Sequence, residues 1–152
     1  VRSPWLTQGY LHEPEKGAEL WQDGWLHTGD MGSIDRHGVL EIKDRIKDVI
    51  KTGGEWISSL ALENLISQHA AVNAVAVVGI PDAHWGERPI ALVVCILGDS
   101  LDQAGLEAHL KQFVDSGQIN KWAIPRQVHF VADIPKTSVG KINKKLIREM
   151  HC

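Results

Sequence analysis

Two strongly apolar runs constrain the fold of this chain more than any other feature. Residues Val72–Ile80 and Ile90–Leu97 are rich in β-branched side chains, and a Pro-Asp pair ends the first run. Runs of this length and composition are typical of strands that are covered on both faces of a sheet. The sequence therefore predicts a sheet with a buried centre in its second half.

Helical spacing surrounds these runs. Ser58 and Ser59 can cap a helix whose apolar residues recur at intervals of three and four, and Leu101–Val114 and Ile142–Met150 show similar spacing. Val128 and Phe130 alternate with polar neighbours as in a short strand. We expect an α+β domain with a central sheet of about three main strands plus a β-hairpin, flanked by helices.

The first forty or so residues have a different character. They are rich in turn formers, with short apolar pieces such as Val39–Ile42 between them and no helix long enough to organise a core. This pattern predicts small β elements that cannot close a core alone. The chain also opens with Val1. We therefore expect a piece of a longer protein, with a domain boundary near residues 43 to 47.

Composition excludes several classes of protein. The chain has 152 residues, 43% of them hydrophobic, and a net charge of −3, which does not suit a protein that coats nucleic acid. No apolar run approaches the 18 residues that would suggest a membrane span, and no secretory signal is visible. Cys95 and Cys152 form no disulfide framework or metal-ligand spacing. A cytoplasmic location is the resulting expectation.

Four short patterns carry residue types that bind nucleotides or anions. They are Gly24–Asp30, Asp44–Glu55, Trp85–Pro89 and Pro135–Lys141. The carboxylate of Asp30 offers two acceptor oxygens, which suit a ribose diol. A glycine directly before Lys141 allows its ammonium to be placed against phosphate, although the spacing is not that of a P-loop. Taken singly, each pattern is also compatible with a plain turn, linker, surface lysine or packed indole.

In this order, the patterns resemble the closing segments of the AMP-forming, adenylate-forming superfamily. That superfamily includes acyl-CoA synthetases, adenylation domains that load carrier proteins, and beetle luciferases. The resemblance extends over the whole chain. The segment Ile46–Ser58 with its Trp56, together with Trp85–Pro89 and Trp122–Pro125, is most similar to medium- and long-chain fatty acid–CoA ligases, including methylmercaptopropionate–CoA ligases.

The resemblance implies an enzyme with two half-reactions. A carboxylic acid and Mg-ATP give an acyl-adenylate and pyrophosphate, and the thiol of CoA then displaces AMP to form acyl-CoA. It also implies that residues 1–44 end the large N-terminal domain and that residues 45–152 form a small mobile lid domain. The lid would rotate about a hinge at Lys47 between the two steps. Without the large domain, the chain is expected to be inactive.

The resemblance also assigns roles to individual residues. Asp30 would hold the ribose hydroxyls of AMP, and Arg45 would contact the same nucleotide. Lys141 would enter the site for adenylation, and Lys51 would face the adenylate in the thioester-forming conformation. The tunnel for the pantetheine arm would be lined by Gly53, Gly54, Glu55 and Trp56. The implied ligands are ATP or AMP, CoA and Mg²⁺, with the metal held mainly by the missing domain and no metal site here.

Two alternatives remain open at this stage. An adenylation domain that loads an acyl group onto a carrier protein would use the same motifs. A non-catalytic module would instead use the basic stretch from Lys121 to Glu149 to bind anions or nucleic acid. That stretch contains seven Lys or Arg and only two Asp or Glu. We expect a carboxylic acid, CoA and the missing domain as partners, with no nucleic acid and no transmembrane segment.

Overall fold

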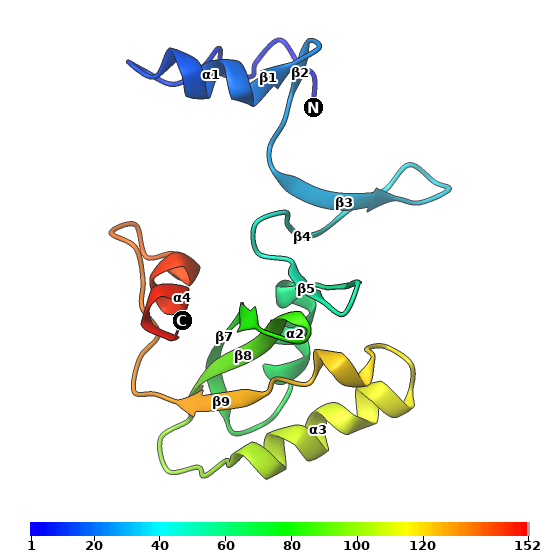
Figure 1. The fold of residues 1–152 in the computed structure, drawn as a ribbon, viewed down its shortest axis with the longest axis vertical. Helices are drawn as coiled ribbons and strands as arrows, with labels where there is room; N and C mark the ends of the chain where they lie inside the picture. The colour runs from blue at the N-terminus through cyan, green and yellow to red at the C-terminus, as the bar shows by residue number, and fades with distance from the viewer. Residues whose placement is uncertain (152) are drawn as a thin grey trace. The chain divides into compact units, whose positions relative to one another are not determined.

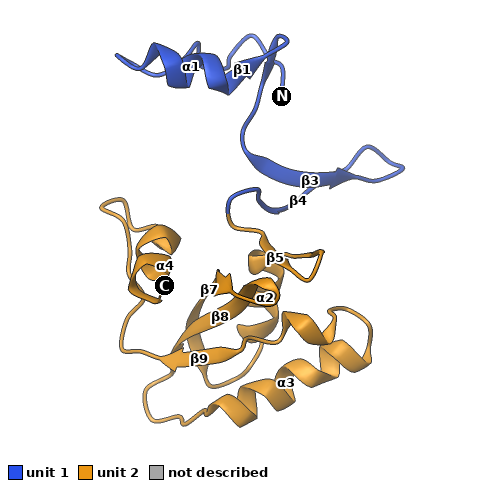
Figure 2. Cartoon of the chain, in the orientation of Figure 1, with its two compact units in different colours: residues 1–47 blue, residues 48–152 orange. Residues whose placement is uncertain are grey.

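A computed structural model describes residues 1–151, and Cys152 lies outside the described residues. The chain divides into two compact units, which meet in the sequence between Lys47 and Asp48 (Figure 2). The division falls at the residue for which we predict a hinge. We describe each unit by itself.

Unit 1, residues 1–47, consists of one short helix and two small hairpins. Its elements are α1 (Pro14–Leu20), β1 (Trp21–Gln22), β2 (Trp25–Leu26), β3 (Asp30–Ile34) and β4 (Leu40–Arg45). Strand β1 pairs with β2, and β3 pairs with β4, both antiparallel. Leu26 is the one buried hydrophobic side chain of residues 1–47, whereas Trp5 is 90% exposed. Because so little apolar surface is covered, this unit has no core of its own.

Unit 2 is built on a five-stranded sheet. Its strands are β5 (Ile50–Thr52), β6 (Glu55–Ile57), β7 (Val72–Asp82), β8 (Gly86–Cys95) and β9 (Gln127–Phe130). Strand β8 is central, because β7 pairs antiparallel along its whole length and β9 pairs parallel with it from Ile90 to Val93. The hairpin of β5 and β6 joins the sheet where Thr52 lies opposite Gly86.

The alternating side chains of β7 create two buried layers. Val75 and Val77 belong to one hydrophobic cluster, and Ala76 and Val78 belong to the other, as expected for residues that point to opposite faces of a strand. The first layer is covered by α2 (Ser59–Ile66) and α3 (Gln103–Asp115), and the second by α4 (Lys144–His151). Figure 1 shows strands β7 to β9 between α3 and α4.

Local sequence explains where the helices of unit 2 begin. The Ser58 hydroxyl accepts a hydrogen bond from the backbone N–H of Ala61 at 3.0 Å, and Asp102 caps α3 in the same way through Gly105. Helix α4 packs through Ile147, which is fully buried. A short 3-10 turn, η1 (Lys121–Ala123), connects α3 to β9.

This architecture confirms the predicted α+β fold with a central sheet, a β-hairpin and flanking helices. Helix α1 was not predicted, because its seven residues bury no side chain and leave no apolar stripe. Cys95 is half-buried against the first hydrophobic layer. Within residues 1–151, no helix is both long and apolar enough to cross a membrane.

Candidate functional site

The predicted nucleotide-binding pair lies side by side in unit 1. Asp30 and Arg45 are directly opposite in the β3–β4 ladder, and Arg45 Nε lies 3.2 Å from Asp30 Oδ1. The Asp30 side chain is 28% exposed and that of Arg45 is 57% exposed. The backbone N–H of Asp30 donates to Thr28 Oγ1, which fixes the turn before the strand. A hydroxyl-rich ligand can therefore reach a carboxylate and a guanidinium at one place.

The predicted hinge residue, Lys47, is the last residue of unit 1 and is exposed. The residues on either side of it are anchored within their own units. The N–H of Ile46 donates to the carbonyl of Gly29, and Asp48 is buried at the start of unit 2. An exposed residue between two anchored neighbours suits a position where a chain changes direction.

The β5–β6 hairpin carries the residues predicted for the thioester step. Lys51 and Trp56 are partners in its ladder, and Lys51 Nζ lies 5.5 Å from the centroid of the Trp56 ring. The Trp56 side chain is 60% exposed. The carboxylate of Glu55 accepts a hydrogen bond from Asn120 Nδ2, which ties the hairpin to the residue before η1. Lys51 and Trp56 therefore share an exposed face of the hairpin, whereas Glu55 holds the hairpin to Asn120.

The two glycines at the hairpin tip have different surroundings. Both have positive φ, +56° for Gly53 and +85° for Gly54. A Cβ on Gly53 would lie 2.9 Å from Cε3 of Trp85, whereas a Cβ on Gly54 would meet nothing within 4 Å. Gly53 therefore makes a close contact inside the domain. Gly54 presents bare backbone to solvent, which is the arrangement that a narrow ligand channel needs.

Trp85 is held in place from several sides. Its ring lies 4.7 Å from that of Trp122 and 4.6 Å from that of His84, centroid to centroid, and its carbonyl accepts from the N–H of Gly53 at 2.9 Å. Asp82 accepts from the N–H groups of Trp85 and His84, both at 3.0 Å. The turn before β8 thus fixes the indole that supports the glycine hairpin.

The same turn perturbs its carboxylate. The backbone N–H groups of Trp85 and His84 lower the pKa of Asp82. Burial opposes them, and the positive charges of Arg126 and Arg88 lower the pKa further. Arg126 Nη1 lies 2.8 Å from Asp82 Oδ2. Asp82 is therefore anionic wherever the turn is formed near neutral pH.

Lys141 lies in an exposed loop before α4. The loop is closed by Thr137, whose N–H donates to the carbonyl of Lys141 at 2.7 Å and whose Oγ1 accepts from the N–H of Lys141 at 3.2 Å. Gly140 takes a positive φ of +79° there. Among residues 1–151, no side chain forms an ion pair with the Lys141 ammonium, whereas Lys136 pairs with Asp133. The loop therefore offers a cation on a braced backbone.

The predicted residues thus form three groups: Asp30 with Arg45, the hairpin from Lys51 to Trp56, and the Lys141 loop. Hydrogen bonds among residues 1–151 do not link the hairpin to the Lys141 loop. The sequence analysis did not predict the hydrogen bonds between Thr137 and the backbone of Lys141. The local Lys-Thr-Ser sequence was the available signal for them. The ion pair of Arg148 with Asp48 was also not predicted, since its partners are 100 residues apart and leave no local signal.

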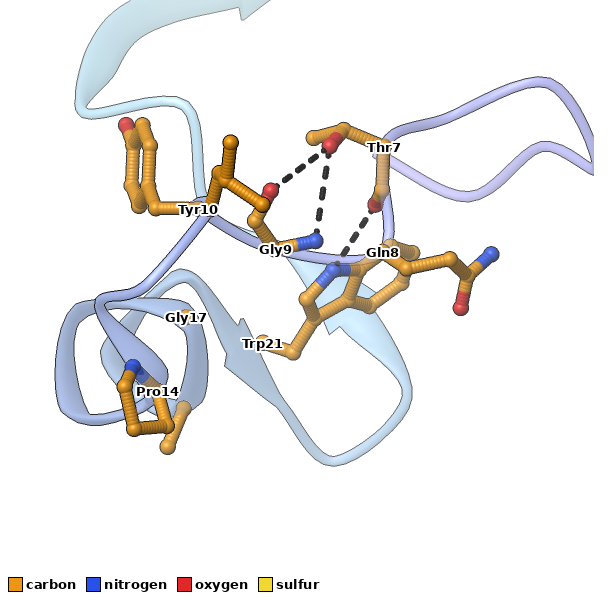
Figure 3. A pocket seen from close by; sticks show the side chains of 9 residues that line it. Thr7, Gln8, Gly9, Tyr10, Pro14, Gly17 and Trp21 are labelled. Atoms are coloured by element: carbon orange, nitrogen blue, oxygen red, sulfur yellow. Dashed lines mark hydrogen bonds between the residues drawn. The ribbon is translucent and has the colours of Figure 1, made fainter.

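A separate open pocket of about 780 Å³ lies in unit 1. It is lined by residues between Thr7 and Trp21, and Trp21 Nε1 donates to the carbonyl of Thr7 at 3.1 Å (Figure 3). None of the predicted site residues lines it. Its lining lacks Asp, Glu, Lys and His, so it offers no charged group for catalysis.

Carboxylates that could hold Mg²⁺ are not clustered in the described residues. No group of three or more His, Cys, Asp or Glu within residues 1–151 is placed to hold a metal ion. Asp30, the carboxylate predicted to bind the nucleotide, is paired with Arg45.

Comparison with known proteins identifies the class. Residues 61–141 match the family described as "AMP-binding enzyme C-terminal domain". The chain is 41% identical over 149 residues to a 3-methylmercaptopropionyl-CoA ligase of Ruegeria pomeroyi, covering 98% of this chain and 26% of the relative. It is 42% identical over 152 residues to a long-chain-fatty-acid–CoA ligase of Thermus thermophilus, covering 99% of this chain and 27% of that protein.

Solved structures also resemble this chain over nearly its whole length. The amide bond synthetase McbA from Marinactinospora thermotolerans matches with a TM-score of 0.87 and 36% identity, over 99% of this chain and 29% of that one. The fold and the matches define a domain of the adenylate-forming ligases. The chain belongs to the AMP-binding enzyme C-terminal domain family. It spans about a quarter of the length of the curated relatives that it matches.

Proposed function

We propose that this chain is the closing part of an AMP-forming acyl-CoA ligase that acts on fatty acids or similar acids. Residues 1–44 would complete the large domain, and residues 45–152 would form the lid that rotates about Lys47. Support comes from the two acyl-CoA ligases that align along nearly the whole chain. The activity would belong to the full-length enzyme, since this chain lacks most of the length of those relatives.

The observation that carries the proposal is the Lys141 loop. Its backbone is braced by Thr137, and its ammonium has no partner among residues 1–151. In the first half-reaction, a carboxylate oxygen of the acid attacks the α-phosphorus of ATP, and pyrophosphate leaves. Negative charge accumulates on the phosphoryl oxygens as the phosphorus becomes five-coordinate. A preorganised lysine at that point stabilises the charge and typically contributes on the order of 10²–10³ in rate.

The Asp30–Arg45 pair would bind the nucleotide during this step. The Asp30 carboxylate can accept from both ribose hydroxyls, and Arg45 can donate to Asp30 and to the nucleotide at once because a guanidinium has five N–H donors. These two residues would orient AMP for the second half-reaction as well.

In the second half-reaction, the thiol sulfur attacks the acyl carbon of the adenylate, and AMP leaves with the bonding electrons. The hairpin would serve this step, with the open backbone of Gly54 beside the thiol arm and the Lys51–Trp56 face toward the adenylate. Exposed basic residues between Lys121 and Arg148 would raise the encounter rate with the phosphates of CoA.

The test uses the full-length enzyme and a series of acids. Pyrophosphate release that depends on the acid, followed by CoA ester formation with fatty acids of several lengths, would support the proposal. Acid-dependent pyrophosphate release with acyl transfer only to a carrier protein would favour the carrier-loading alternative. Absence of pyrophosphate release with every acid would contradict the proposal.

A further inference from the structure

The helix that follows the Lys141 loop forms an ion pair with the first residue of unit 2. Arg148 Nη2 on α4 lies 2.7 Å from Asp48 Oδ1, across 100 residues of sequence. The side chains are 27% and 12% exposed, respectively. Asp48 directly follows Lys47, where the two units divide. This ion pair therefore joins α4 to the point where the chain enters unit 2.

A second ion pair joins α4 to α2. Lys144 Nζ lies 2.8 Å from both Glu63 Oε1 and Ser59 Oγ. Glu63 Oε1 also accepts from the N–H of Val77 on β7 at 2.8 Å. Both partners are mostly buried, with side chains 15% and 13% exposed. This pair holds α4 to α2 and, through Glu63, to β7.

A third ion pair on α4 is exposed, and both of its partners belong to the helix itself. Lys145 Nζ and Glu149 Oε1 are 3.7 Å apart, lie one turn apart on α4, and have side chains 86% and 58% exposed. An exposed pair of this kind contributes little, because water screens both charges. Removing Arg148, by contrast, takes this counter-ion away from the largely buried carboxylate of Asp48.

The Lys141 loop and α4 are mechanically continuous. Asn143 caps the helix, since its Oδ1 accepts from the N–H of Leu146 at 3.1 Å. Its own N–H donates to the carbonyl of Pro135 at 2.8 Å, and a β-bridge joins Lys136 to Ile142. A displacement of α4 is therefore transmitted to the loop that presents Lys141.

We propose that Asp48 and Arg148 are positioning residues for Lys141, because their ion pair couples the residue after the hinge to the helix that carries the Lys141 loop. When the chain turns at Lys47, Asp48 turns with unit 2, and Arg148 holds α4 in register with it. Lys141 then reaches the reacting phosphate in one fixed geometry rather than a range of positions. This inference rests on the proposed function of Lys141 in adenylation.

The test compares two half-reactions in the full-length enzyme. Pyrophosphate release from acid and ATP reports adenylation, and CoA ester formation from supplied acyl-adenylate reports the second step. Arg148→Met removes the cation but keeps side-chain volume, and Asp48→Asn removes the anion but keeps its shape. Lys145→Met, on the same helix, breaks the exposed pair and serves as the matched control. Arg148→Lys keeps a charge that can still reach Asp48.

We expect Arg148→Met and Asp48→Asn each to slow adenylation by roughly 10- to 100-fold, since a misplacement of about 1 Å can cost that much. Thioester formation should stay close to wild type, because Lys141 is not used there. The double variant should lose no more than either single variant, and Arg148→Lys should recover part of the rate. Lys145→Met should leave adenylation at the wild-type rate, since CoA takes no part in that step.

Three results would overturn the inference. They are adenylation unchanged in Arg148→Met and Asp48→Asn, both half-reactions falling together in Asp48→Asn, and additive losses in the double variant. Lys141→Ala in the same assays tests separately the proposed role of Lys141 in adenylation, on which this inference rests. If Lys141→Ala keeps adenylation, the proposed function fails. If it loses adenylation while the Arg148 and Asp48 variants keep it, only the coupling fails.

Discussion

Gly53→Ala and Gly54→Ala offer a matched pair of perturbations at the hairpin tip. Both residues have positive φ, where an L-residue pays about 1–2 kcal/mol. At Gly53, the new methyl group would also lie 2.9 Å from Cε3 of Trp85. Trp85 has little freedom to retreat, because it packs on Trp122 and His84.

The clash with Trp85 determines how much more stability Gly53→Ala loses than Gly54→Ala. Overpacking of this kind adds about 1–3 kcal/mol, so Gly53→Ala should lower the free energy of unfolding by about 2–5 kcal/mol and Gly54→Ala by about 1–2 kcal/mol. Urea denaturation of the 152-residue chain, followed by far-UV circular dichroism, measures both values. Equal losses in the two variants would refute the argument that Trp85 is what requires glycine at position 53.

Two further predictions concern pH. Burial, together with the charge of His151, lowers the pKa of His129. In mildly acidic solution, His129 is therefore protonated to a greater extent in the unfolded chain than in the folded chain. The free energy of unfolding should therefore fall as the pH drops below about 6.5, and His129→Phe should weaken that dependence in urea titrations, with an unchanged slope counting against the assignment. The pKa of Asp82 is lowered by the N–H groups of Trp85 and His84, so its contribution is present above about pH 4 and lost below it. Asp82→Asn should lower Tm at pH 7, and the difference from wild type should shrink on acidification; a constant difference would contradict this account.

The architecture of unit 2 was predictable because several local signals agree. The β-branched runs became β7 and β8, and Ser58 caps α2 as expected. These elements are specified by neighbouring residues, so a sequence pattern is enough to find them. The order of the glycine and lysine motifs in turn carried the family resemblance, which the family match at residues 61–141 supports.

Contacts between distant residues could not be predicted in this way. Nothing near Gly53 indicates that Trp85, 32 positions later, lies against it, and nothing near Asp48 indicates Arg148. Both contacts depend on how β8 and α4 pack after the sheet has formed. The two adjacent glycines looked equivalent in sequence, whereas the structure gives one a packing role and leaves the other open.

Unit 1 shows a different limit. Its residues form hairpins and one short helix but bury one hydrophobic side chain, Leu26. Local turn signals were sufficient to predict small β elements. They could not show that Asp30 and Arg45 would lie opposite each other, because that pairing depends on a register shift between Met31 and Gly32.

The central claim is that Lys141 acts in the first half-reaction and not in the second. The most direct test is Lys141→Ala in the full-length enzyme, with pyrophosphate release and CoA ester formation from supplied acyl-adenylate measured separately. We predict that pyrophosphate release falls by on the order of 10²–10³, while ester formation from the adenylate is retained. Retention of both activities in Lys141→Ala would contradict the account, and so would loss of ester formation alone.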